Sequence, residues 1–491
     1  MSDRSVRTYG GWRRSRGIGL FGLEQFQTVL VLAALTALLI TVSVALPALI
    51  VVGPIAAIVL VLAIARWDGV TLVSMGRQRM RWLLGTSKGH HRYAGGLAGN
   101  GQHPWELPGV LAATHVVTAS DASGEFGVVH HRRLGTLTVA LDVAASAPWL
   151  VDDDQVDSWV ANWGSWLAGL GHVPALSWVN VIVDTAPASG TRLADYVSTR
   201  MAPTAPAAAR HLLSKLVAAA PSTAADVSTW VALTFDPSMF LSKPKNLEDS
   251  IAEVVQLLPG LQDALGGCGV SVLSRMDAAQ LAGIVRAAFD PAARGAVTRA
   301  LEDGSDRKDL SWQAAGPVAA EETWDYYRHE SARSVSWYWH EAPRHNVTAY
   351  VLARLMAPSR HPKRVSLMYR PFTAAEAAKT VEREVNAADF RDALRAAQRR
   401  DEKARDRADR DRANRAAYEE AAGAGLGLTS MVVTTTVTSE SDLPHAVAEV
   451  ETLAEASKLL MRRAWGGNAA LFAATLPLGI CPPVLARTWP N

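Results

Sequence analysis

An uncharged run from Gln25 to Ala65 constrains this chain more than any other feature, because it holds 41 residues without a charged side chain or histidine. One helix crosses the hydrocarbon layer of a bilayer with about 20 residues, so a run of this length predicts two crossings. Helix-breaking residues divide the run near its middle: Pro47, Gly53 and Pro54. We therefore expect a two-helix transmembrane hairpin over residues 25–66, with helices near Phe26–Leu46 and Ala48–Ala65.

Basic residues flank the run on both sides and predict its orientation. They include Arg13 and Arg14 before it and Arg66, Arg77, Arg79 and Arg81 after it. Because Lys and Arg near a span stay on the cytoplasmic side, both termini are expected in the cytoplasm. The sequence thus predicts a multi-pass protein of the cell (plasma) membrane, with the lipid bilayer as a partner. A cleavable signal peptide fits less well, since its apolar core is shorter.

Alternating strand and helix patterns follow the apolar run. A hairpin is expected over Phe126–His131 and Thr136–Val143, followed by an amphipathic helix and a strand over Trp178–Val183. The pattern then recurs, with strands expected over Ser334–His340, Val347–Leu355 and Val365–Tyr369. The predicted fold class is α+β: an N-terminal two-helix transmembrane hairpin, then cytoplasmic ferredoxin-like sheet and helix units and a long charged helix.

These patterns divide the chain into five parts. They are a basic cytoplasmic tail (1–24), the transmembrane hairpin (25–66), a basic juxtamembrane segment and linker (67–105), a first α+β region (106–320) and a second α+β region (321–491) with a long helix over 373–422.

The long helix is rich in charges of both signs. Acidic and basic residues recur at i,i+4 spacing, which supports an exposed helix, so a solvated face is the favoured interpretation. Its local excess of positive charge leaves contact with an acidic partner or with nucleic-acid phosphate open. The arginines that would make this contact are Arg395, Arg399, Arg400, Arg405 and Arg412. The whole chain has a formal charge of only +2, which excludes nucleic-acid binding through overall positive charge.

Motifs for catalysis or metal binding are absent from the sequence. The two cysteines, Cys268 and Cys481, are far apart and form no Cys-x-x-Cys pair. No Gly-x-x-x-x-Gly-Lys-Ser/Thr stretch is present. The segment His340–His345 has the wrong spacing for a zinc protease, and Pro343 interrupts it. We expect a protein that is not an enzyme and holds neither a cofactor nor a metal.

Tryptophan is unusually frequent, with 16 residues against nine Phe and nine Tyr. Trp159, Trp163 and Trp166 share one helical face, and Trp337 and Trp339 share one face of a strand. Packing in the domain cores is the favoured interpretation, and docking of a partner is the alternative.

Several unusual stretches give the chain a family resemblance. They are Tyr9–Leu23 (YGGWRRSRGIGLFGL), Trp105–Leu111 (WELPGVL), Trp159–Leu170 (WVANWGSWLAGL), Leu265–Val272 (LGGCGVSV), Ser334–Pro343 (SVSWYWHEAP), Val381–Phe390 (VEREVNAADF) and Thr475–Arg487 (TLPLGICPPVLAR). With these the chain resembles integral membrane proteins associated with actinobacterial conjugation, a PrgI-like or type IV secretion-associated family. It resembles a small inner-membrane subunit joined to the region that precedes the motor of the type IV secretion ATPase.

The resemblance implies a non-enzymatic, membrane-anchored scaffold of a conjugative DNA-transfer machine. In the related ATPases a motor domain follows a Leu-Pro-Leu stretch, here Leu476–Leu478, but only 13 residues follow it in this sequence. A separately encoded ATPase and other channel subunits are therefore the expected partners, and self-association is left open. The alternatives are a membrane component of a type VII protein-secretion apparatus and a membrane-anchored enzyme with a site that motifs do not reveal.

Overall fold

The computed structural model describes most of the chain and divides it into two compact units. The described residues are 8–10, 25–44, 46–67, 70–96, 105–147, 150–188, 191–202, 204–219, 225–303, 307–341, 343, 346–383, 414–415, 417–419 and 425–488. The larger unit draws on residues 1–12, 92–381 and 415–491, and the smaller on 13–91 and 382–414.

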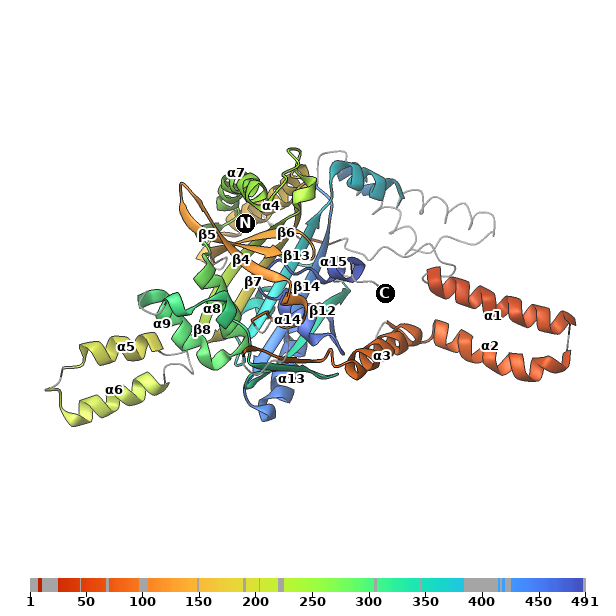
Figure 1. Cartoon of the computed structure of the whole chain (residues 1–491), viewed down its shortest axis with the longest axis horizontal. Coiled ribbons are helices and arrows are strands. Elements are labelled where there is room, and N and C mark those ends of the chain that lie inside the picture. The colour runs from red at the N-terminus through yellow and green to blue at the C-terminus, as the bar shows by residue number, and fades with distance from the viewer. Residues whose placement is uncertain are drawn as a thin grey trace, which may run out of the picture. The chain divides into compact units, whose positions relative to one another are not determined.

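Thirteen of the described strands form one sheet in the larger unit, in the order β3-β10-β11-β12-β14-β13-β7-β8-β6-β5-β4 (Figure 1). Two short strands complete it: β9 pairs β6, and β15 pairs β12. All the pairings in this sheet are antiparallel. The strands are β3 (Arg92–Ala94), β4 (Thr114–Asp121), β5 (Gly124–His131), β6 (Thr136–Ala145), β7 (Leu176–Pro187), β8 (Ala225–Phe235), β9 (Val270–Arg275), β10 (Ala319–Glu322), β11 (Tyr327–His329), β12 (Ala332–Glu341), β13 (Lys363–Pro371), β14 (Gly427–Val437) and β15 (Leu460–Arg463).

This single sheet overturns the predicted fold class of small ferredoxin-like units behind a transmembrane hairpin. The strands that were expected in separate sheets are joined because β7 and β13 pair along their lengths, from Val179–Tyr369 to Thr185–Lys363. Each strand covers one edge of the other, and β8 and β14 cover their outer edges, so neither has a free edge.

The sheet consists of two halves with the same chain path. In each half a hairpin (β5-β6 or β11-β12) is followed by a strand at the far side (β7 or β13) and by a strand between them (β8 or β14). A helix and a short strand (β9 or β15) then return to the second strand of the hairpin. The helices of the larger unit include α4 (Asp153–Gly169), α5 (Thr191–Arg200), α6 (Ala207–Ala219), α7 (Leu247–Gly266), α8 (Ala278–Phe289), α9 (Arg294–Asp303), α10 (Ala353–Met356), α13 (Leu443–Ala456), α14 (Asn468–Ala474) and α15 (Pro482–Thr488).

The registers of the two halves match residue for residue. Leu141 lies opposite Val231 in the first half, as Trp337 lies opposite Val433 in the second. Ile182 pairs with Ser366 where the halves meet, and the two residues occupy equivalent positions in their own halves. The larger unit therefore has an approximate two-fold axis through the β7–β13 pair.

Apolar side chains alternate between the two faces of the sheet, and helices cover both. On one face, α4 and α7 pack over the first half and α13 over the second. On the other face, a core continuous across both halves packs against α8 and α14. The tryptophans follow this plan: Trp166 and Trp337 are buried, and Trp163 and Trp339 pack against the cores. Trp163 and Trp166 stack at 4.9 Å between ring centroids. The prediction of core packing is confirmed for these four tryptophans, whereas Trp159 is only half-buried, with its ring against Gly269.

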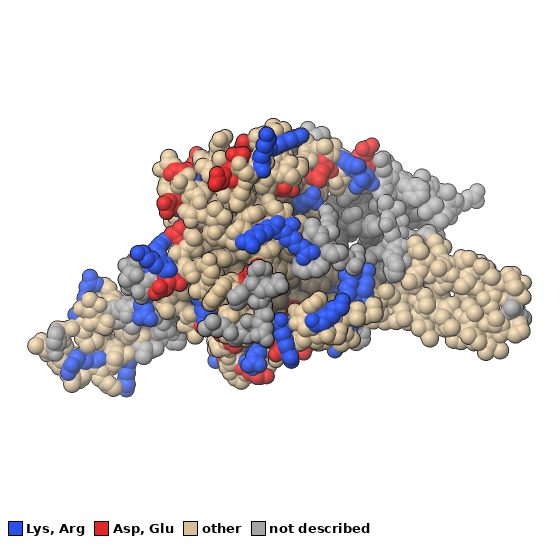
Figure 2. Space-filling model, in the orientation of Figure 1, with Lys and Arg blue, Asp and Glu red and all other residues tan. Residues whose placement is uncertain are grey.

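The smaller unit contains the uncharged run as two helices that pack against each other, α1 (Gln25–Val44) and α2 (Leu49–Ile64). Figure 2 shows this hairpin as a stretch without charged side chains. Among the described residues, no helix combines the length with the apolar composition that a membrane crossing needs. The predicted transmembrane hairpin and the predicted multi-pass membrane localisation are therefore wrong.

The helices and the turn between them lie close to their predicted positions, so the difference lies in the length of α2 and the composition of α1. A 3-10 turn at Leu46–Ala48 ends α1 and leaves α2 with 16 residues. At 1.5 Å per residue α2 spans about 24 Å, less than the hydrocarbon thickness of about 30 Å. The longer helix α1 contains polar residues: Gln25, Gln27, Thr28, Thr36, Thr41 and Ser43. Thr36 and Thr41 donate hydrogen bonds to carbonyls of their own helix, at 2.8 Å each.

The arginines that were expected to flank a membrane fall in different places. Arg66 lies in the two-residue strand β1 (Arg66–Trp67), which pairs β2 (Val70–Thr71). Arg77, Arg79 and Arg81 are exposed on α3 (Leu72–Ser87), and the Arg79 guanidinium lies 4.9 Å from the centre of the Trp82 ring. Arg13 and Arg14 lie outside the described residues.

Two further predictions for the second half have mixed outcomes. The strand predicted over Val347–Leu355 is wrong, because this segment forms turns and the start of α10. Its apolar residues Leu352 and Leu355, together with the following Met356, have helical spacing and pack in one core. The long helix begins as predicted: residues 374–383 are helical, and Thr373 and Glu376 exchange backbone-to-side-chain hydrogen bonds of 3.3 and 3.4 Å. The arginines from Arg395 to Arg412 lie outside the described residues.

Candidate functional site

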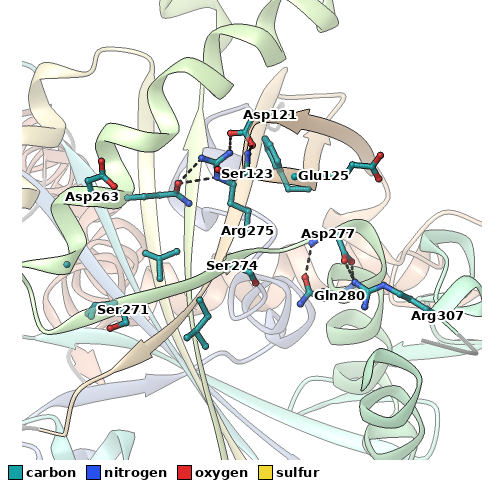
Figure 3. Close-up of a pocket in the computed structure, with 17 residues that line it drawn as sticks. Asp121, Ser123, Glu125, Asp263, Ser271, Ser274, Arg275, Asp277, Gln280 and Arg307 are labelled. Carbon is teal, nitrogen blue, oxygen red and sulfur yellow. Dashed lines mark hydrogen bonds and ion pairs between the residues drawn. The ribbon is translucent and has the colours of Figure 1, made fainter. Parts of the chain in front are cut away.

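A groove beside strand β9 opens on the surface of the first half (Figure 3). Its walls are β9, the turn of the β4–β5 hairpin, the end of α7 and the start of α8. We call it the β9 groove. Its volume of about 790 Å³ lies within the range of ligand sites, about 300–1,000 Å³.

The end of α7 fixes the position of β9. The helix stops at Gly266, and Gly269 adopts a left-handed φ of +73°. A Cβ atom at Gly269 would lie 2.5 Å from the Trp159 ring, so glycine is required there both for its conformation and for its size. The chain then returns along β6 as β9, with an irregularity that leaves Leu273 without a partner in the register.

Arg275, at the end of β9, forms a fixed cationic contact in the groove. It pairs with Asp121 from the β4–β5 hairpin, and both side chains are nearly covered, with exposed fractions of 8% and 13%. Its Nε and Nη2 atoms donate to Gln262 Oε1 at 3.1 and 2.8 Å, and its guanidinium lies 5.1 Å from the centre of the Phe126 ring. The hydrogen bond from Arg275 is the main reason that the pKa of Asp121 is lowered. Asp121 is therefore a stable anion.

Asp277 ties the other end of the groove to helix α8. Its carboxylate accepts from the Gln280 N–H at 2.9 Å, and the Gln280 side chain accepts from the Asp277 N–H at 2.9 Å, a complete capping box. Asp277 also pairs with Arg307. Figure 3 shows this pair and the Asp121–Arg275 pair as two separate ion pairs near the end of β9.

Two other carboxylates of the groove make no ion pair or hydrogen bond in the described part of the chain. These are Glu125, on β5, and Asp263, near the end of α7; both are exposed. Because Asp121 and Asp277 are balanced by Arg275 and Arg307, Glu125 and Asp263 give the groove a net negative charge.

The chemistry of the groove favours binding over catalysis. Its lining contains serines, carboxylates and arginines, but neither histidine nor cysteine. A serine nucleophile needs an adjacent base, and a carboxylate held as an anion by arginine is a weak one. No cluster of three or more possible metal ligands occurs within the described ranges.

The sequence predictions did not identify this groove. Its charged residues are scattered over three segments far apart in the chain, 121–125, 262–280 and Arg307. One signal was available: the stretch Leu265–Val272, quoted for the family resemblance, contains the turn and the first half of β9. Cys268 and Cys481 are buried free thiols.

Comparisons with known proteins add no functional assignment to these observations. No family model matches the chain, and no curated protein matches its sequence.

Proposed function

We propose that this protein is a non-enzymatic scaffold of a conjugative, type IV secretion-like DNA-transfer machine, and that it docks a separately encoded ATPase through the β9 groove. The observation that carries the docking site is the edge of β9, because in the described part of the chain this strand pairs β6 alone. An exposed strand edge with unpaired backbone groups is a common docking surface for another polypeptide. The choice of machine rests on the family resemblance of the sequence.

The fixed charges of the groove support a docking role. Arg275 and Asp121 hold the β4–β5 hairpin against β9, so this wall is already formed before a partner arrives. A preformed wall lowers the entropic cost of binding. The free carboxylates of Glu125 and Asp263 add a charge that can select a partner by complementarity.

Copurification from cells that carry the conjugative element tests this function. A tagged full-length chain should retain the conjugative ATPase, and the double charge reversal Glu125→Lys/Asp263→Lys should lower both the retained ATPase and the DNA-transfer frequency at least about tenfold. The matched control is Glu455→Lys, which reverses an exposed carboxylate on α13 in the second half and should leave both unchanged.

Two outcomes would overturn the proposal. One is a type VII core ATPase in place of the conjugative ATPase. The other is unchanged ATPase retention and transfer in the double variant, which would show that the groove does not dock the motor.

A further inference from the structure

The outward edge of β9 presents backbone groups at defined positions. Ser146 N–H donates to the Gly269 carbonyl at 2.9 Å, so the backbone groups of Gly269 face β6. Along an antiparallel strand, the backbone N–H and C=O groups of successive residues point alternately toward and away from the neighbouring strand. The backbone groups of Ser271 therefore point toward β6, and those of Val270 and Val272 point away from it. The N–H and C=O groups of Val270 and Val272 therefore point into the β9 groove.

The opposite wall of the groove is also an open strand edge. Strand β5 pairs β6 only over Val128–His131, whereas its first residues pair β4 alone. Strands β5 and β9 thus pair with successive parts of the same edge of β6. We call the opening between the unpaired start of β5 and strand β9 the fork. The fork closes where Gly127 N–H donates to the Met276 carbonyl at 2.8 Å. Gly124, Glu125 and Phe126 line one side of the opening and β9 lines the other.

The charge of the fork defines which segment it would accept. Arg275 and Arg307 are engaged by Asp121 and Asp277, so neither attracts an acidic ligand strongly. Glu125 and Asp263 have no such counter-charge among the described residues. An extended segment lying along β9 would place alternate side chains near these two carboxylates, which favours Lys or Arg at those positions.

We infer that the β9 groove binds an extended, basic segment of the docked partner, which adds to β9 as a further antiparallel or parallel strand. This inference rests on the proposed docking function and specifies its chemistry. Backbone hydrogen bonds to Val270 and Val272 supply affinity, and the carboxylates of Glu125 and Asp263 select basic side chains. Strand β9 has six residues, so the recognised segment has a similar length, about 20 Å when extended.

A defined peptide probes this inference without the partner. The probe is a fluorescent, terminally blocked hexapeptide of alternating lysine and valine, and its control has glutamate in place of lysine. Fluorescence anisotropy with the full-length chain should show saturable binding of the lysine peptide and at least about tenfold weaker binding of the glutamate peptide. Binding of the lysine peptide should weaken as salt rises, because the carboxylates are exposed.

A proline variant tests whether the peptide binds as a strand. Val272→Pro removes one N–H that faces the groove and leaves the bonds between β9 and β6 in place, as proline is tolerated at an open strand edge. It should weaken binding of the lysine peptide about tenfold, equivalent to about 1.4 kcal/mol. Val272→Ala is the matched control, since it shortens the same side chain but keeps the N–H, and it should bind within about twofold of the original chain. Unfolding curves of both variants verify that the fold is retained.

The amide variants Glu125→Gln and Asp263→Asn test selection by charge. Together they should abolish the preference for lysine over glutamate while keeping the dependence on the Val272 N–H. Three results would overturn the inference: no saturable binding of the lysine peptide, equal binding by the Val272→Pro and Val272→Ala variants, or a preference for lysine that survives the double amide variant.

The result can be separated from that of the copurification. If the peptide binds as described but no conjugative ATPase copurifies, the groove accepts a basic strand and the proposed function is wrong. If the ATPase copurifies and the peptide does not bind, the docking function stands and strand addition is wrong.

Discussion

The two halves of the sheet share a topology and differ where a short strand returns to the hairpin. In the first half, Arg275 at the end of β9 pairs with Asp121 and the fork remains an open groove. Arg463 is its equivalent at the end of β15, opposite Trp337. There, Trp324 and Trp465 stack at 6.4 Å between ring centroids, and Arg463 lies 4.5 Å from the centre of the Trp465 ring.

The equivalent residues show what the topology requires and what it does not. An arginine at the end of the short strand occurs in both halves, which is consistent with a role in holding the strand beside its hairpin. Among the described residues at the two forks, such an aromatic pair occurs in the second half alone, where Gly466 N–H also donates to the Trp324 carbonyl at 2.8 Å. Because the same chain path can carry aromatic packing at its fork, the open, acidic fork of the first half is a feature of its side chains and not of the fold.

The largest expected effect is a loss of folding stability, and it tests whether the two halves have equivalent cores. Leu141 and Trp337 occupy matching positions and are fully buried. Replacement by alanine should lower the free energy of unfolding by about 2–5 kcal/mol for Leu141 and about 3–5 kcal/mol for Trp337, from lost burial and the cavity left behind. Urea unfolding measures both. Leu273→Ala is the control, since Leu273 is 63% exposed and should change stability by less than about 0.5 kcal/mol.

A smaller effect is expected on the pH dependence of stability. It concerns two histidines at equivalent hairpin positions, His131 and His329. Both are buried, and burial lowers the pKa of His131 and lowers that of His329 to about 3. The His329 ring forms hydrogen bonds through Nδ1 with the Phe289 carbonyl at 2.6 Å and through Nε2 with Ser334 Oγ at 2.8 Å. In the unfolded chain each imidazole is protonated near pH 6.5, whereas the buried imidazole of the folded chain stays neutral at that pH. The stability present at pH 7.5 is therefore lost as the pH falls through 6.5 toward 3.

For His329 this linkage amounts to about 2 kcal/mol between pH 7.5 and pH 5. His329→Gln should therefore reduce the loss of stability over this interval by about that amount, as measured by unfolding at both pH values. His131→Gln provides the comparison within the same fold. An unchanged pH dependence in the His329 variant would contradict the burial of a neutral imidazole at this position.

A further variant tests whether the aromatic pair stabilises the second fork alone. Trp324→Ala should lower the free energy of unfolding by more than about 1 kcal/mol, because it removes both the aromatic pair and the burial of the ring. Binding of the lysine peptide at the first fork should remain within about twofold. A loss of peptide binding in this variant would mean that the peptide binds at the second fork and not in the β9 groove.

The smallest effect concerns the helices that follow the two short strands. Asp277 caps α8 with its side chain, whereas Gly467 at the start of α14 makes no such bond. Asp277→Ala should cost about 1 kcal/mol of stability by thermal unfolding. Asp277→Asn keeps an acceptor for the cap and loses only the partly exposed pair with Arg307, so it should cost less. Equal costs would assign the effect to the ion pair.

Local patterns predicted much of the secondary structure but not the assembly of the sheet. The local patterns in Thr136–Val143 and Trp178–Val183 were sufficient to place β6 and β7, and the long helix expected over 373–422 does begin just after Thr373. The pairing of Val179 with Tyr369 joins residues far apart in the chain, and no local period encodes it. For that reason two expected small units became one sheet.

The groove was beyond reach of the sequence for the same physical reason. Asp121, Arg275 and Arg307 each have ordinary local roles near a turn, a strand end and a short 3-10 helix. Only the tertiary structure brings them to one opening. The apolar run shows the converse: its break near Pro47 correctly predicted both helices and the turn between them, but its uncharged length predicted a membrane crossing that neither α1 nor α2 supports.

Hydrogen–deuterium exchange of residues 269–276 tests the central claim most directly. It would be measured on the full-length chain alone and in its complex with the conjugative ATPase. The account predicts that the amides of Val270 and Val272 exchange readily in the free chain and become protected in the complex, while those of Ser271 and Ser274 change little because they already face β6. A complex that forms with no added protection at Val270 and Val272 would contradict docking at the edge of β9.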